Sequence, residues 1–146
     1  MCKKIVFFIF FILTNLHAED EYFLTLRNEN VNLRQGPSFE YPIKIFYKKK
    51  FLPVLIQDKS NNFKKIRDHE NNSGWIHVSQ LSKKKAGITI DPDLIVFKGP
   101  TVYSRPVVIL ELGRLCIIKK CKKEWCKIEV GKYTGWIKKK SLWGRL

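Results

Sequence analysis

The sequence predicts an all-β protein made of two small tandem β-barrels after an N-terminal export signal. Three observations lead to this prediction. A set of landmarks occurs twice at near-constant spacing, short β-rich segments alternate with Gly-, Pro- and Asn-rich turns, and no window of about 11 residues beyond the N-terminal segment shows helical periodicity. Apolar residues make up 45% of the 146-residue chain and aromatic residues 13%, which is enough to form packed cores.

Residues 1–18 have the layout of a secretory signal peptide. Lys3 and Lys4 precede an unbroken apolar run at residues 5–13, and a cleavage site can end at Ala18. This run of nine residues is shorter than the roughly 20 that a helix needs to cross a bilayer. We therefore expect an exported, periplasmic protein. The alternative is a protein anchored in the inner membrane through an uncleaved N-terminal segment.

The repeated landmarks divide the rest of the chain into two copies. Gly36-Pro37 is followed by Gly74-Trp75 after 38 residues, and Gly99-Pro100 is followed by Gly135-Trp136 after 36 residues. Matching order at nearly matching distance indicates two copies of one fold. Gly and Pro at these points are typical of loops, because Gly accepts positive φ and Pro lacks a backbone donor.

Strand and boundary signals support the same division. Residues 51–57 and 112–118 are apolar and rich in β-branched side chains, as expected of strands, and the polar stretch 68–74 is a turn. The basic stretch 83–87 predicts a linker between domains at 22–82 and 88–146. A domain of about 60 residues buries only about 60% of its unfolded surface. We therefore expect the two barrels to pack on each other.

Short motifs in both copies match a known family pattern. Those of the first copy are Asn32-Leu33-Arg34, Gly36-Pro37, Tyr41-Pro42, Lys48-Lys49-Lys50, Leu52-Pro53-Val54, Ile66-Arg67-Asp68 and Gly74-Trp75-Ile76-His77. Those of the second copy are Cys121, Trp125-Cys126, Tyr133, Gly135-Trp136 and Leu142-Trp143-Gly144. The chain resembles a family of exported bacterial SH3-like domains from alphaproteobacteria. The resemblance implies two tandem SH3-like barrels, and the family has no assigned activity.

Cys121 and Cys126 are expected to form a disulfide bond. If Lys123 and Glu124 form a two-residue hairpin turn, the two cysteines face each other as a non-hydrogen-bonded pair. The Cα atoms of such a pair are about 4.5 Å apart, inside the disulfide window of about 4.4 to 6.8 Å. An oxidising compartment favours the bond.

The remaining cysteine of the mature chain, Cys116, lies in an apolar segment and is expected to be a small buried core residue. Three thiols at this spacing without a nearby histidine do not form a typical zinc site. We expect no metal and no other cofactor. The histidines after the signal, His69 and His77, lie in the first copy and the cysteines in the second. With no converging acid, base and nucleophile, the sequence predicts a protein that is not an enzyme.

Aromatic side chains are the candidate ligand-binding residues, because SH3-like barrels commonly bind peptides in an aromatic-lined groove. If Cys126 and Ile128 point inward, the alternation of a strand leaves Trp125 partly exposed, and by the repeat Phe63 occupies the same place. The candidates are Tyr41, Tyr47, Phe63, Trp75, Tyr103, Trp125, Tyr133 and Trp136. For Trp75 and Trp136 the alternative is burial in a core, and His77 is expected to be a packed, hydrogen-bonded strand residue.

The formal net charge is +15, from 28 basic and 13 acidic residues. Removal of two lysines with the signal leaves +13. The lysine triplets at 48–50, 83–85 and 138–140 indicate either solvated turns or a basic face that binds an anionic surface. Export argues against nucleic acid as the partner. We expect a binding module for cell-envelope material, such as the peptide or glycan of peptidoglycan. The alternative is a periplasmic adaptor that binds a peptide segment of another envelope protein.

Overall fold

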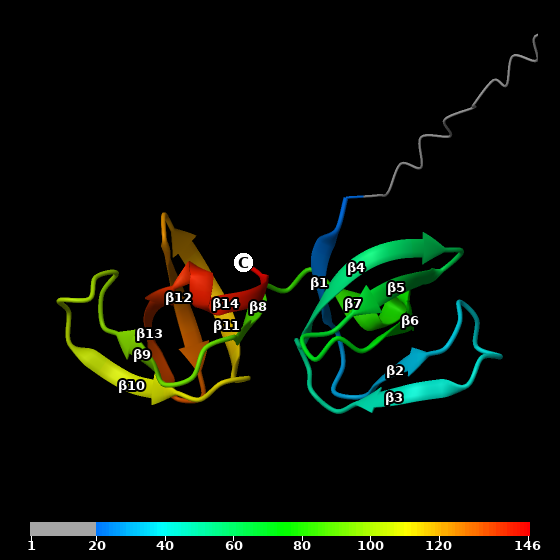
Figure 1. Cartoon of the computed structure of the whole chain (residues 1–146), viewed down its shortest axis with the longest axis horizontal. Helices are drawn as coiled ribbons and strands as arrows, with labels where there is room; N and C mark the ends of the chain where they lie inside the picture. Colours follow the sequence, from blue (N-terminus) through cyan, green and yellow to red (C-terminus); the bar gives the residue numbers. More distant parts are fainter. Residues whose placement is uncertain (1–19) are drawn as a thin grey trace, which may run out of the picture.

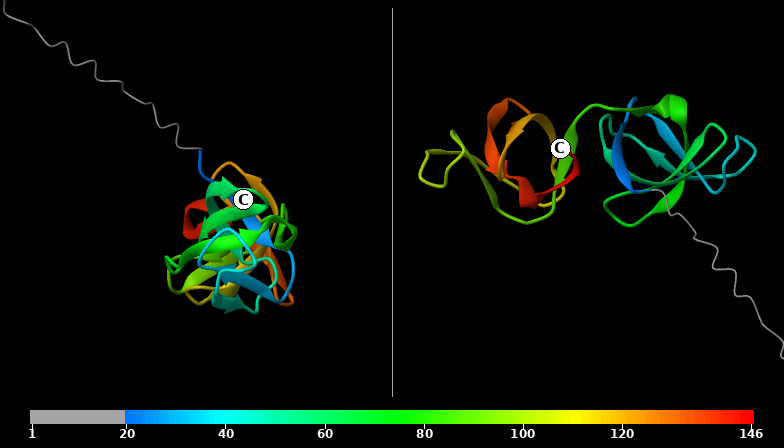
Figure 2. Two further views of the ribbon diagram at one scale, coloured as in Figure 1. Left: turned by 90° about the vertical axis from the view of Figure 1, so that its right-hand side faces the viewer. Right: turned by 90° about the horizontal axis from the view of Figure 1, so that it is seen from above.

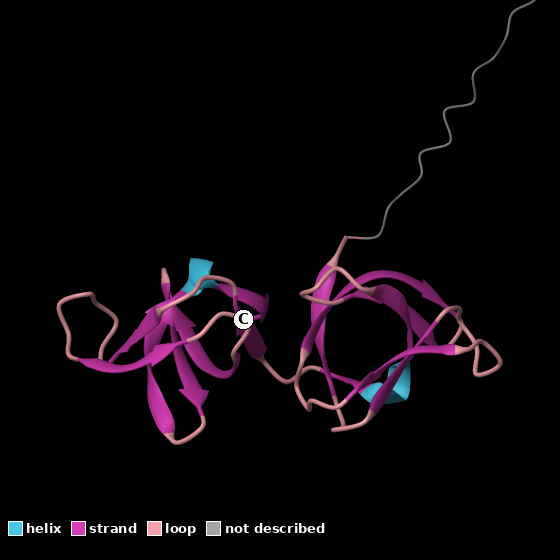
Figure 3. Ribbon diagram, turned by 60° about the horizontal axis from the view of Figure 1, so that its bottom comes forward, coloured by secondary structure: helices cyan, strands magenta, loops and turns pink. Residues whose placement is uncertain are grey.

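The computed structural model describes residues 20–146, so the expected signal peptide lies outside the described residues. In the described range the regular structure consists of strands and two short 3₁₀ turns. The strands form two seven-stranded antiparallel sheets, and each sheet curves into a small barrel (Figures 1–3). The prediction of an all-β protein with two tandem barrels is confirmed. Within the described range, no helical segment is long and apolar enough to cross a membrane.

The first barrel contains seven strands and one 3₁₀ turn. These are β1 (Tyr22–Leu26), β2 (Val31–Arg34), β3 (Ile43–Tyr47), β4 (Pro53–Ser60), β5 (Phe63–Arg67), β6 (Ser73–His77), η1 (Val78–Gln80) and β7 (Leu81–Ser82). The sheet order is β3-β2-β6-β5-β4-β1-β7. Its core is built from aliphatic side chains such as Leu26, Leu33 and Ile66, which are fully buried.

The second barrel repeats this arrangement. Its elements are β8 (Ala86–Thr89), β9 (Leu94–Phe97), β10 (Pro106–Leu110), β11 (Leu115–Lys122), β12 (Trp125–Val130), β13 (Tyr133–Lys138), η2 (Lys139–Ser141) and β14 (Leu142–Arg145). The sheet order β10-β9-β13-β12-β11-β8-β14 matches the first barrel strand for strand. Along β12, Cys126, Ile128 and Val130 are buried and the residues between them are half-exposed, which is the alternation expected of a strand with one core-facing side.

The repeated glycines before Trp75 and Trp136 let two strands approach closely. A Cβ atom at Gly74 would lie 2.7 Å from the carbonyl oxygen of Arg34, and one at Gly135 would lie 2.6 Å from that of Phe97. Both distances are too short for a real Cβ contact, so a larger residue would force the strands apart. The repeat therefore preserves a glycine at this position in each barrel.

The two barrels contact each other along β1 and β14. The rings of Phe23 and Trp143 meet edge to face at 4.8 Å, and the Arg145 guanidinium donates a hydrogen bond of 2.9 Å to the carbonyl oxygen of Phe23. Ile88 of the second barrel is buried against the core of the first. The packing that we expected from the small size of each barrel is present.

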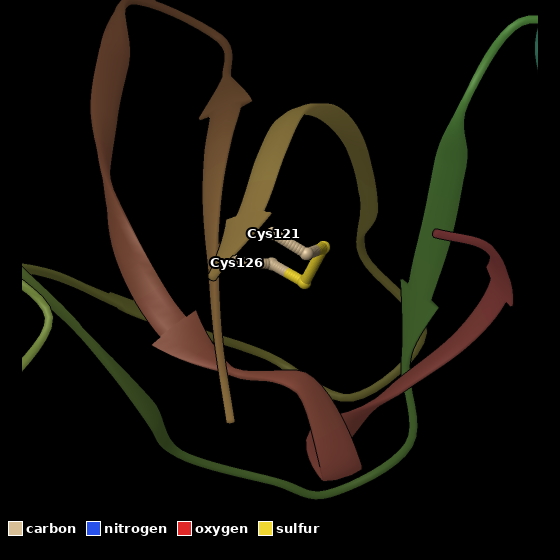
Figure 4. The surroundings of a disulfide bond; sticks show 2 residues. All are labelled: Cys121 and Cys126. Atoms are coloured by element: carbon tan, nitrogen blue, oxygen red, sulfur yellow. A yellow bond between two sulfur atoms is a disulfide. The ribbon is translucent and has the colours of Figure 1, made fainter. Parts of the chain in front are cut away.

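A disulfide bond joins the two strands of the β11–β12 hairpin (Figure 4). Cys121 pairs with Cys126 across the hairpin, and their Cα atoms are 4.0 Å apart. The turn consists of Lys123 and Glu124, and Lys123 has a φ of 54°. The sequence-based prediction of this hairpin and its disulfide is confirmed, and the Cα atoms lie closer together than the expected separation of about 4.5 Å.

Replacing both cysteines, as in Cys121→Ser with Cys126→Ser, should lower the free energy of unfolding by roughly 2 kcal/mol, because the bond restricts the unfolded chain over a short loop. Urea denaturation at neutral pH measures this difference. As a control, a reductant should destabilise the wild-type protein and leave the double variant unchanged. Equal stability of the oxidised wild type and the variant would contradict this account.

Candidate functional site

Three aromatic side chains of the first barrel form a compact group, which we call the aromatic cluster: Phe39, Phe63 and His77. The ring centroids are 5.1 Å apart in each of the three pairs. The Phe39 and His77 rings are stacked with an interplanar angle of 29°, and Phe63 meets each of the other two rings edge to face. Both geometries are favourable for aromatic pairs.

Two strands and one loop bring these residues together. Phe63 begins β5 and pairs with His77 at the end of β6, whereas Phe39 comes from the loop between β2 and β3. Arg34 at the end of β2 holds this loop, since its Nη1 donates hydrogen bonds of 3.0 Å to the carbonyl oxygens of Phe39 and Tyr41. The Arg34 guanidinium also lies over the Phe39 ring, 5.3 Å from its centroid.

The His77 ring is fixed by the first residues of η1. Its Nδ1 lies 2.7 Å from Ser79 Oγ, and it accepts a hydrogen bond of 3.2 Å from the Ser79 backbone N–H. The expectation that His77 is a packed, hydrogen-bonded residue agrees with this geometry. The ring nevertheless also stacks against the exposed Phe39, so His77 supports a surface aromatic rather than the barrel core.

The cluster has a buried floor and an exposed rim. Phe63 is 5% exposed and Phe39 is 64% exposed. Beside them lies a hollow of about 530 Å³, lined by Pro37, Ser38, Phe39, Glu40, Asn61, Asn62, Phe63 and His77. The lining combines ring faces with hydroxyl, amide and carboxylate groups. Such a surface can stack on an apolar ring or peptide face while hydrogen-bonding its polar substituents.

The other predicted candidates of the first barrel lie outside this cluster. Tyr41 follows in the same loop and is exposed, and its ring packs against Gly36. Tyr47 is buried and its hydroxyl donates a 2.8 Å hydrogen bond to Asp68 Oδ2. Burial, with this hydrogen bond, raises the pKa of Tyr47 far above its usual value. Trp75 is half-buried on β6, opposite Lys65 of β5 and Arg34 of β2.

The second barrel carries its candidates in a different arrangement. Trp125 is half-buried and meets Phe97 edge to face at 5.9 Å. Trp136 is only 8% exposed, as the alternative of burial expected, but it lies outside the core cluster of the second barrel and packs beneath Lys120. Tyr103 is 95% exposed in the loop that corresponds to the one holding Phe39, and Tyr133 is partly exposed at the start of β13.

The repeat placed Phe63 and Trp125 at equivalent positions, and the strand register agrees, since each begins a strand after a two-residue turn. The expectation that Phe63 shares the partial exposure of Trp125 is wrong. Phe39 and His77 cover the Phe63 ring, whereas the position equivalent to His77 is Lys138, which pairs with Trp125.

Sequence reasoning missed the role of Phe39 and underestimated that of His77. Phe39 lies in a loop with no periodic pattern, and counting from Gly36 and Gly99 its counterpart in the second copy is Val102. One signal was available, because a large aromatic two residues after Gly36-Pro37 in a polar loop has no strand face on which to be buried.

The thiols and the imidazoles of the described residues lie in different barrels. His69 and His77 belong to the first barrel, whereas Cys116, Cys121 and Cys126 belong to the second. Cys121 and Cys126 are bonded to each other, and Cys116 is free but fully buried. Burial raises the pKa of the Cys116 thiol from 9.0 to about 11, against the opposing effect of Arg114 and Lys49. The thiol is therefore protonated at neutral pH.

Cys116 should react with a thiol reagent only when the second barrel opens. At pH 8 the folded protein should be modified at this residue at least about 100-fold more slowly than the protein in denaturant, because the thiol is inaccessible and protonated. Mass spectrometry of the peptide containing Cys116 measures the rate. Modification of the folded protein at the denatured rate would show that the thiol is exposed.

Comparison with known proteins adds a family and a few distant structures. The family described as bacterial SH3 domain matches residues 27–83 and 91–144. Among curated proteins, none matches the chain significantly. Solved structures that match the chain include NlpC2 from Trichomonas vaginalis, with 14% identity, a TM-score of 0.38, and coverage of 85% of this chain and 48% of that one.

Two further structures match at a similar level. NlpC1 from Trichomonas vaginalis has 14% identity and a TM-score of 0.37, with coverage of 86% of this chain and 46% of that one. An NlpC/P60 family protein from Bacillus cereus has 10% identity and a TM-score of 0.38, with coverage of 84% and 56%. The chain spans about half the length of these structures.

Proposed function

Because the chain belongs to the bacterial SH3 domain family, with one copy of the domain in each barrel, we propose that it is a non-enzymatic, exported module that binds cell-envelope material. The aromatic cluster of the first barrel is its recognition site, and the peptide or glycan of peptidoglycan is its ligand. The observation that carries this proposal is the exposed Phe39 ring, stacked on His77 at the rim of a polar hollow.

The exposed ring supplies the apolar part of recognition. Phe39 is held in place by contacts with His77, Phe63 and Arg34. Its side chain is still 64% exposed, although burying a phenylalanine side chain fully is favourable by about 1.5–3 kcal/mol. A ligand that covers the exposed part of the ring gains part of that free energy. The ring is already ordered, so little side-chain entropy is lost on binding.

The polar groups beside Phe39 supply orientation. Asn61 and Asn62 offer amide donors and acceptors, Ser38 a hydroxyl and Glu40 a carboxylate. Sugar rings present apolar C–H faces with hydroxyls at their edges, and short peptides present amide groups and charged ends. Both parts of peptidoglycan therefore fit a hollow with this mixture of groups.

The absence of catalysis is part of the proposal. The free thiol of the described residues is buried in the second barrel, and both described histidines belong to the first. His77 Nδ1 is engaged with Ser79. Ser79 Oγ and His77 Nδ1 are a hydroxyl and an imidazole within hydrogen-bonding distance, but among the described residues no carboxylate hydrogen-bonds the His77 ring to orient it as a base.

Phe39→Ala should weaken binding to isolated peptidoglycan sacculi by at least about fivefold, because the ligand loses the surface on which it stacks. Co-sedimentation of the purified protein with sacculi, at low and moderate salt, measures this. The matched control is Tyr103→Ala, which removes an exposed aromatic from the corresponding loop of the second barrel and should bind as the wild type does. Both residues lie in loops and belong to neither core cluster, so neither change should unfold a barrel.

Two outcomes would overturn the proposal. If Phe39→Ala and the wild type bind sacculi equally, the aromatic cluster is not the recognition site. If the wild-type protein does not sediment with sacculi even at low salt, peptidoglycan is not the ligand.

One observation favours a second function, a protein–protein adaptor. Strand β10 lies at the edge of the second sheet and exposes apolar side chains, with Ile109 63% exposed and paired with the exposed Ile95 of β9. An edge strand has unpaired backbone groups that can accept a strand from a partner. Cross-linking from position 109 in cells to one discrete envelope protein, with no sedimentation on sacculi, is the result that this function predicts.

A further inference from the structure

The outer face of the β11–β12–β13 sheet carries a group of lysines and tryptophans that we call the lysine face. It consists of Lys120, Lys122, Trp125, Lys127, Trp136 and Lys138. The strand register places these residues in two rows, one formed by Lys120, Lys127 and Trp136 and the other by Lys122, Trp125 and Lys138. Residues directly opposite each other in a sheet share a face. Buried Cys126 and Ile128 alternate with the β12 members and point into the barrel.

The same six positions of the first barrel have different chemistry. The corresponding rows are Asp58, Lys65 and Trp75, and Ser60, Phe63 and His77. Four lysines of the second barrel thus correspond to Asp58, Ser60, Lys65 and His77. The basic character is therefore specific to the second barrel, although the two sheets share strand order and register. If these lysines reflected only a lysine-rich composition of the whole chain, the same positions of the first barrel would be expected to be lysines as well.

The tryptophans of this face lie beneath the lysine side chains. The Lys120 ammonium lies 5.7 Å from the centroid of the Trp136 ring, and the Lys138 ammonium 5.9 Å from that of Trp125. These contacts hold two ammonium groups over aromatic rings. No member of the lysine face is among the exposed large hydrophobic side chains of the described residues. The face therefore offers positive charge rather than a surface for stacking or for insertion into a bilayer.

A hollow of about 430 Å³ adjoins the face at the tip of the β11–β12 hairpin. It is lined by Lys123, Glu124, Lys138, Lys139 and Lys140. A 2.7 Å hydrogen bond from the Lys139 backbone N–H to the Glu124 carbonyl oxygen holds η2 against the hairpin turn. Four ammonium groups and one carboxylate leave the hollow with a formal excess of three positive charges. Each phosphate inside a linear polymer carries about one negative charge, so a chain that brings several successive phosphates to the hollow and the adjoining rows can balance this excess.

We propose that the lysine face and its adjoining hollow bind a linear polymer that carries phosphate groups. One phosphate occupies the hollow, and further phosphates along the polymer meet the lysines of the two rows. Adjacent strands lie about 4.8 Å apart, so the rows present several ammonium groups within the reach of successive phosphates. This site and its ligand differ from those of the aromatic cluster, which lies on the first barrel.

Inorganic polyphosphate is the probe that tests this proposal with the purified full protein. The variant replaces four exposed lysines by glutamine: Lys120, Lys122, Lys123 and Lys139. The control replaces four exposed lysines elsewhere, Lys48, Lys83, Lys98 and Lys132, and so changes the net charge equally. We expect the first variant to raise the Kd by at least about tenfold and the control by less than about threefold, with a shallower salt dependence for the first variant.

If both variants lose affinity for polyphosphate to the same extent, net charge alone attracts the polymer, and the lysine face is not a specific site. Equal affinity for polyglutamate of matched total charge would overturn the assignment to phosphate. Tighter binding to vesicles of phosphatidylglycerol and phosphatidylcholine, per accessible phosphate, would overturn the assignment to a polymer. Phe39→Ala should bind polyphosphate as the wild type does, so this test is independent of the aromatic cluster.

Discussion

The contact between β1 and β14 is the interaction on which the arrangement of the whole chain depends. Phe23 and Trp143 pack edge to face across it, Arg145 donates to the Phe23 carbonyl oxygen, and Ile88 completes the core of the first barrel. A barrel of about 60 residues buries too little surface to be more than marginally stable alone. Because the second barrel contributes a side chain to the first core, we expect the two barrels to support each other.

The two barrels use the same strand order and register for different chemistry. At the positions of Phe63 and His77, the second barrel has Trp125 and Lys138. In the first barrel the loop between β2 and β3 adds Phe39, and the result is an aromatic surface with polar neighbours. In the second barrel the same sheet positions carry lysines over tryptophans. The shared strand order and register therefore support two unlike surfaces, because the outward-facing side chains differ.

Much of the fold could be predicted from the sequence because its signals are local or repeated. The Gly-Trp pairs mark a close strand approach, the alternation in residues 125–130 marks a core-facing strand, and the spacing of Cys121 and Cys126 fits a tight hairpin. The site was less predictable, because the exposure of Phe63 depends on a loop that folds back over it. Lysines scattered along 120–138 form a face only once the strand register, with its irregularity after Ile118, is known.

Backbone hydrogen exchange followed by NMR at neutral pH tests most directly whether the two barrels behave as one body. Amides in both cores, such as those of Ile66 and Ile128, should share the same highest opening free energy, to within about 1 kcal/mol, because the barrels unfold together. The same values should fall together in Trp143→Ala, which removes the contact with Phe23. The account would be contradicted if the highest opening free energies of the two cores differed by more than about 2 kcal/mol in the wild-type protein and stayed unchanged in Trp143→Ala.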